Sequence, residues 1–213
     1  MLNKKILTKE EQSKLTPDKV IEILKRGNQR FTNNNFTVKN DLEQGYNTVS
    51  KQHPAAVILS CIDSRVLVEN IFKCGIGDVF VVRVAGNIVN SDILGSMEYA
   101  CKESGSKLVV VMGHGDCGAV KAAIDGVELG NITGLVNKIK PAVNQSKENY
   151  KGEVKSSNAE FVEMVGRTHV ELMLNEIRRS SPILKEMEED GEIKIVGAMY
   201  NMESGKVEFL ENK

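Results

Sequence analysis

The chain has 213 residues and a formal net charge of −1, because 28 Lys and Arg residues nearly balance 29 Asp and Glu residues. This balance excludes the strong basic field that nucleic-acid binding uses, and no apolar run approaches the roughly 20 residues that a membrane span needs. Four cysteines are too few for a disulfide scaffold in a chain of this length. The first residues show no apolar run of signal-peptide length, so we expect a cytoplasmic protein with reduced cysteines.

The first 15 residues are polar, and we expect a loosely held arm there, ahead of a single domain over residues 16–213. Thr16 and Pro17 are typical of a helix start, with threonine as the N-cap and proline at the first helical position. Apolar residues follow at helical spacing up to Phe31, and three asparagines at 33–35 end the predicted helix.

Four apolar, β-branched segments come next, each bounded by turn residues, at 56–60, 79–84, 108–112 and 193–199. They lack polar alternation, which is typical of parallel strands buried on both faces. Helical patterns alternate with them at 67–72, 92–103, 119–125 and 131–189, where Pro141, Pro182 and an exposed loop at 151–158 interrupt the last. After a turn at 200–205, residues 207–210 predict an antiparallel edge strand. We therefore expect an α/β protein whose central sheet has four mostly parallel strands and an antiparallel edge strand, flanked by helices, with an N-terminal helical arm.

Sulfur and imidazole side chains follow two of the predicted strands. Cys61 comes directly after the first strand, and His114 and Cys117 follow the third. In an open α/β sheet, ligands bind beyond the carboxyl ends of the strands. Two thiolates and one imidazole suit zinc and leave a fourth position open for water. Three nearby glycines would let the backbone turn tightly: Gly113, Gly115 and Gly118.

A cysteine taken alone is more often a small buried hydrophobe than a metal ligand. The combination of Cys61 with H-x-x-C at a second strand end, beside Asp63 and Arg65, favours the metal site. Arg65 can hold the Asp63 carboxylate by two hydrogen bonds. Asp63 is then a fourth zinc ligand, an acceptor for a hydrogen bond from bound water, or both. An ordinary ion pair at a helix start is the alternative.

The remaining histidines and cysteines carry weaker signals. His169 lies in a helical apolar pattern and is expected to be structural, and we do not expect His53 to carry protons. Cys74 and Cys101 lack ligand-like neighbours in the sequence.

The chain resembles the β-class carbonic anhydrases from about residue 17 to residue 210. The motif C-x-D-S-R appears at 61–65 and G-H-x-x-C-G at 113–118, with softer matches at 27–31 and 77–87. The resemblance implies one zinc ion per chain on Cys61, His114 and Cys117, with Asp63 paired to Arg65. It also implies a homodimer or tetramer with the site at the dimer interface, a small substrate (carbon dioxide or bicarbonate), and neither nucleic acid nor membrane as a partner.

Two subtypes of this family differ around the pocket. In the plant-like, open-site subtype a glutamine lies nine residues before the first cysteine, where this chain has Gln52, and apolar pocket positions match Phe80 and Tyr99. The other subtype has a tryptophan three residues before that cysteine, where this chain has Ile58, so the resemblance favours the plant-like subtype. Val84 stands where the family usually has asparagine, which puts some hydrogen bonding near the pocket wall in doubt.

The function that the resemblance implies is the zinc-dependent, reversible hydration of carbon dioxide to bicarbonate and a proton by attack of zinc-bound hydroxide, a lyase activity. Two thiolates donate more charge than imidazoles, so we expect a somewhat alkaline activity profile. Two alternatives keep the same zinc site: a hydrolase of carbon disulfide or a similar heterocumulene, and a non-catalytic zinc-binding regulatory protein. A thiol redox enzyme is a third, although the sequence contains no C-x-x-C.

Overall fold

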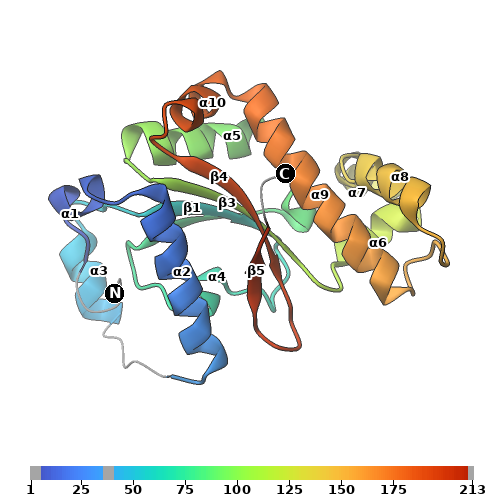
Figure 1. Cartoon of the computed structure of the whole chain (residues 1–213), viewed down its shortest axis with the longest axis horizontal. Helices are drawn as coiled ribbons and strands as arrows, with labels where there is room; N and C mark the ends of the chain where they lie inside the picture. Colours follow the sequence, from blue (N-terminus) through green and yellow to red (C-terminus); the bar gives the residue numbers. More distant parts are fainter. Residues whose placement is uncertain (1–5, 36–40, 211–213) are drawn as a thin grey trace.

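The computed structural model describes residues 6–35 and 41–210, which form one central sheet with helices on both faces (Figure 1). The sheet has five strands in the order β2-β1-β3-β4-β5. The strands are β1 (Ala56–Ser60), β2 (Val79–Arg83), β3 (Leu108–His114), β4 (Lys194–Tyr200) and β5 (Val207–Phe209). The first four pair in parallel, and β5 pairs antiparallel to β4. The predicted fold class is therefore confirmed.

Apolar side chains cover both faces of the central strands. Every residue of β1 and β3 is buried, as expected for strands that are covered on both faces. Val57 and Leu59 pack toward α5 (Ser91–Glu98), α9 (Ala159–Ser180) and α10 (Pro182–Glu189), while Ile58 packs toward α2 (Pro17–Thr32) and α4 (Val68–Ile71). Figure 1 shows these two groups of helices on opposite sides of the sheet. The alternation follows from the two-residue period of a strand.

The other helical segments complete the chain. They are α1 (Lys9–Ser13), α3 (Asp41–Thr48), the 3₁₀ turn η1 (Ala85–Asn87), the π-helical turn η2 (Tyr99–Glu103), α6 (Gly118–Ile124), α7 (Gly130–Asn137) and α8 (Lys140–Asn149). The predicted interruptions at Pro141 and Pro182 fall in the first turns of α8 and α10. No helix was predicted at α3, because its large apolar side chains, Leu42 and Tyr46, are exposed and form no buried face. Among the described residues, no helix combines the length and hydrophobicity needed to cross a membrane.

The segment expected as a loosely held arm is docked onto the domain, so this expectation is wrong for its described part. Thr8 caps α1 through a reciprocal pair of hydrogen bonds with Glu11. Gln12 is 4% exposed, and its Nε2 donates to the carbonyl oxygens of Pro54 and Ser104 at 2.8 Å each. A buried amide that satisfies two backbone carbonyls fixes a segment whose polar sequence gives no sign of burial.

The helix predicted from Thr16 is α2, and it approaches the domain closely. Thr16 accepts a hydrogen bond from the Lys19 amide, as an N-cap does. A Cβ atom at Gly27 would lie 1.9 Å from the Phe72 carbonyl oxygen, so only glycine fits there. The neighbouring Asn28 is buried, donates to the Gly205 oxygen and accepts from the Val207 amide, which ties α2 to the β4–β5 hairpin.

Candidate metal centre

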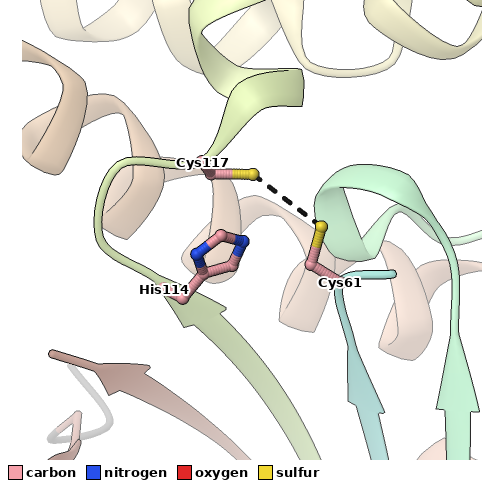
Figure 2. A group of neighbouring side chains, drawn as sticks. All are labelled: Cys61, His114 and Cys117. Atoms are coloured by element: carbon pink, nitrogen blue, oxygen red, sulfur yellow. Dashed lines mark hydrogen bonds between the residues drawn. The ribbon is translucent and has the colours of Figure 1, made fainter. Parts of the chain in front are cut away.

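Three predicted ligand residues, separated by up to 56 positions in sequence, meet at one edge of the sheet. Cys61 follows β1, His114 ends β3, and Cys117 precedes α6. Because β1 and β3 are adjacent and parallel, with Ser60 opposite Met112, their carboxyl ends lie together. The ligand atoms all lie within 4.8 Å of one another, and the two sulfur atoms are 4.0 Å apart (Figure 2). All three residues are buried, at 2–4% exposed.

The turn that brings His114 and Cys117 together does not depend on the neighbouring glycines in the expected way. Neither Gly113, Gly115 nor Gly118 has a positive φ, and the left-handed residue of the turn is Asp116, at φ 54°. Gly113 is instead required by space, because a Cβ atom there would lie 2.7 Å from the Met199 sulfur. The predicted tight turn therefore exists, but its physical basis was predicted wrongly.

The imidazole of His114 is oriented as a metal ligand. Its Nδ1 lies 2.8 Å from the carbonyl oxygen of Gly115. A carbonyl only accepts, so Nδ1 carries the proton and Nε2 is left with a free lone pair. This buried Nε2 has no hydrogen-bond partner among the described residues and belongs to the group of atoms that includes both sulfurs. This arrangement fits a metal ion at Nε2, since metal-binding histidines commonly donate their other N–H to a carbonyl.

The two thiols perturb each other strongly. The hydrogen bond with Cys117 is the main cause that lowers the pKa of Cys61 to about 4, against an opposing effect of burial. The pKa of Cys117 is raised, first by that same bond with Cys61 and then by burial. The pair thus holds one proton between them, because two thiolates this close repel each other. A dication would remove that repulsion and let both sulfurs ionise, and two thiolates with one imidazole are a ligand set typical of zinc.

Asp63 and Arg65 form the predicted pair. Arg65 donates from Nε to Oδ1 at 3.0 Å and from Nη2 to Oδ2 at 2.8 Å, and its backbone amide also donates to Oδ1. These hydrogen bonds hold the pKa of the Asp63 carboxyl well below its usual range, although partial burial acts against them. The carboxylate does not belong to the close cluster of ligand atoms formed by Cys61, His114 and Cys117.

Arg83 lies in the family match at 77–87, but the sequence predicted no role for it; in the structure it holds the segment 61–63. It ends β2, donates from Nε to the Cys61 carbonyl oxygen at 3.0 Å, and donates from Nη2 to the Asp63 carbonyl oxygen at 2.6 Å. Its neighbour Val84 stands where an asparagine was expected and packs between two apolar clusters, with its backbone amide donating to the Ser60 carbonyl. An arginine at a strand end resembles an ordinary surface charge, so only the fold reveals its contact with the loop.

The residues predicted to line the substrate pocket lie away from the candidate metal ligands of the same chain. Gln52 and Tyr99 line a cleft of about 620 Å³ that also includes residues of α1. Phe80, on β2, meets the Tyr99 ring edge-on at a centroid distance of 6.3 Å. Gln52 precedes β1 and Cys61 follows it, so the length of this five-residue strand, about 16 Å at 3.3 Å per residue, separates them within one chain. The structure thus groups Gln52, Phe80 and Tyr99 together, but apart from the sulfur cluster of the same chain.

The chain is thus an α/β protein with a candidate metal centre. Two buried thiols and an imidazole form this centre beyond the ends of adjacent parallel strands. The family model for carbonic anhydrase matches residues 56–207. Carbonic anhydrase 2 of Mycobacterium tuberculosis (strain CDC 1551 / Oshkosh) is 34% identical over 189 residues, covering 86% of this chain and 87% of that protein. The carbonic anhydrase of Mycolicibacterium smegmatis is 31% identical over 191 residues, covering 87% and 89%.

Solved structures agree with this assignment. The crystal structure of the β-carbonic anhydrase CafA of Aspergillus fumigatus has a TM-score of 0.71 and 26% identity, covering 80% of this chain and 81% of that one. One of two β-carbonic anhydrases of Sordaria macrospora, described as tetrameric, has a TM-score of 0.68 at 24% identity, covering 80% and 92%, and shows the shared fold. The chain belongs to the β-class carbonic anhydrase family.

Proposed function

We propose that the chain binds one zinc ion through Cys61, His114 and Cys117 and catalyses the reversible hydration of carbon dioxide to bicarbonate and a proton. The observation that carries this proposal is the buried Nε2 of His114, which has no hydrogen-bond partner in the described part of the chain and lies beside two sulfur atoms that are 4.0 Å from each other. Membership of the β-class carbonic anhydrase family supports the reaction. Zinc, when bound there, would supply a Lewis acid that makes water nucleophilic near neutral pH.

The protein residues in this mechanism orient the reactants. Asp63 accepts a hydrogen bond from the attacking water and so directs its lone pair toward carbon dioxide. Arg65 keeps that carboxylate ionised, because it occupies both oxygens of Asp63. Since the carboxylate stands with Arg65 and outside the close ligand cluster, we favour Asp63 as a hydrogen-bond acceptor over Asp63 as a fourth ligand. This choice corresponds to the plant-like, open-site subtype.

An apolar shell surrounds the ligands. Cys61 and Cys117 belong to a buried cluster with side chains from α6 to α9, including Val120, Ile139 and Phe161. A low local dielectric strengthens the hydrogen bonds that hold the site and limits access of bulk water. The thiols of Cys61, Cys101 and Cys117 form no disulfide, which fits the reducing, cytoplasmic setting that we propose.

Carbon dioxide hydration, followed by stopped flow on protein of measured metal content, tests the reaction. Asp63→Asn should keep about one zinc per chain and lower the rate constant by at least about 100-fold, the lower range for loss of a positioned acid–base group. Asp190→Asn, an exposed carboxylate beyond α10, is the matched control and should leave both values unchanged. Full zinc content without any hydration activity in the unmodified protein would favour the heterocumulene hydrolase or the regulatory protein instead.

We also propose that the chain forms at least a homodimer in which Gln52, Phe80 and Tyr99 of one protomer complete the site of its partner. Two observations support this: the three residues lie apart from the ligands of their own chain, and Tyr99 is 56% exposed. Gln52 would donate a hydrogen bond to a substrate oxygen, and the two aromatic rings would form an apolar wall.

Mixed dimers test this arrangement. Cys61→Ala lacks a ligand and Gln52→Ala lacks the donor, so each variant alone should be nearly inactive. Unfolding and refolding them together produces dimers in which one site combines an intact metal centre with an intact Gln52, and activity should return. If Gln52 acted on the site of its own chain, the mixture would stay as inactive as its components.

A further inference from the structure

The turn after β2 contacts the candidate metal centre through its backbone. In η1, Gly86 has φ 65° and Asn87 has φ 40°, so two successive residues adopt the left-handed conformation. The Gly86 amide donates to the Cys61 sulfur at 3.3 Å. A Cβ atom at Gly86 would lie 2.7 Å from an Ile139 side-chain carbon, so the turn is also tightly packed. A strained turn of this kind persists only where surrounding contacts hold it.

One of those contacts comes from a histidine far away in the sequence. His169, on α9, is 1% exposed, and its Nε2 lies 2.8 Å from the Gly86 carbonyl oxygen. The carbonyl only accepts, so Nε2 carries the proton. Burial lowers the pKa of His169 and thus favours the neutral ring with this single N–H donor. Gly86 is therefore held at both ends, by Cys61 at its amide and by His169 at its carbonyl.

A purely structural role explains this histidine poorly. Its Nδ1 is buried and has no hydrogen-bond partner among the residues that the structure describes. A buried, unsatisfied ring nitrogen is unfavourable, and an apolar side chain of similar size would avoid it. What such a side chain would lose is the hydrogen bond to Gly86.

We propose that His169 is a positioning residue for the metal centre, holding the Gly86 turn so that its amide stays on the Cys61 sulfur. This inference rests on the proposed zinc site. An N–H···S hydrogen bond withdraws charge from a thiolate ligand and fixes its direction, and partners of this kind commonly change metal affinity by about 10–100-fold. The sequence predicted only a structural role for His169, since its neighbours follow a helical apolar pattern.

Three variants separate positioning from packing. His169→Leu removes the donor at similar size, and His169→Gln keeps an N–H donor with similar reach. Ile177→Val is the control, because Ile177 is fully buried on the same helix and belongs to the core between α9 and the sheet. Zinc affinity is measured by competition with a chelator, and cobalt(II)-substituted protein is measured by its thiolate-to-cobalt charge-transfer absorption.

We expect His169→Leu to bind zinc about 10-fold more weakly and to shift the charge-transfer band. His169→Gln should restore most of the affinity, and Ile177→Val should change neither readout. Should the leucine variant not fold, His169→Asn serves in its place, because its amide is one methylene too short to reach the same carbonyl. Equal zinc affinities and identical cobalt spectra for His169→Gln and for the variant without the hydrogen bond, His169→Leu or His169→Asn, would overturn the inference while leaving the zinc site intact. Unmodified protein that shows no thiolate-to-cobalt band would overturn the proposed function and the inference together.

Discussion

Gly113 precedes a proposed zinc ligand, and replacing it by alanine tests the packing that positions His114. The new Cβ atom would lie 2.7 Å from the Met199 sulfur and 2.8 Å from Val170 Cγ2, where carbon contacts are optimal at about 3.5–4.0 Å. The Met199 side chain can move, but Val170 is β-branched, fully buried and on a helix, so its rotamer is stiff. Strand β3 or helix α9 must therefore shift.

The size of the effect follows from two opposing terms. Overpacking of this kind costs about 1–3 kcal/mol, and the loss of glycine flexibility in the unfolded chain offsets about 0.4–1 kcal/mol. We expect Gly113→Ala to be less stable by about 1–2 kcal/mol, which lowers the thermal midpoint by roughly 2–8 °C for a chain of this size. Circular dichroism melts of metal-free protein measure this.

A matched glycine and a double variant make the test specific. A Cβ atom at Gly134, on α7, would have no neighbour within 4 Å, so Gly134→Ala should be neutral or slightly stabilising. The double variant Gly113→Ala/Val170→Ala should lose less stability than the sum of the two single variants, by at least about 0.5 kcal/mol, because the smaller residue 170 leaves room for the new Cβ atom. A Gly113→Ala protein as stable as the unmodified chain would refute the argument that space, rather than backbone conformation, requires this glycine.

Two further predictions concern the zinc content of cysteine variants and the dependence of stability on pH. Cys117→Ser should lower the measured zinc content from about one per chain toward zero, whereas Cys101→Ser should retain it, because Cys101 lies outside the ligand cluster and burial raises its pKa to about 12. Metal-free protein should lose stability as the pH falls below about 6.5, since buried His169 stays neutral in the fold while the unfolded chain takes up a proton. The free energy of unfolding, measured with urea between pH 7 and pH 5, should fall with pH less steeply in His169→Gln than in the unmodified protein, by up to about 1.4 kcal/mol per pH unit. Equal pH dependence in the two proteins would contradict a buried, neutral His169.

The strands were predicted closely because fully buried parallel strands have a distinctive sequence. Runs of Val, Ile, Leu and Ala without polar alternation marked β1 at the same boundaries as the structure and placed the others to within one or two residues. The docking of residues 6–15 was missed because it depends on Gln12, whose burial follows from two carbonyls that lie 42 and 92 positions away. Hydrophobic periodicity carries no information about such polar contacts.

The residues of the candidate site likewise fall into a group that the sequence predicts and a group that only the fold reveals. Cys61, His114 and Cys117 were predictable because their chemistry is rare and their positions at two strand ends follow from topology alone. Arg83, Gly86 and His169 were not, because each acts through a backbone group. The Arg83 side chain donates to the backbone carbonyls of Cys61 and Asp63, and the Gly86 amide donates to a sulfur 25 positions away. A backbone carbonyl or amide is the same at every position, so no residue type marks it in advance. The contacts that support this candidate metal centre therefore depend on the fold, and variants such as His169→Leu, rather than sequence motifs, test them.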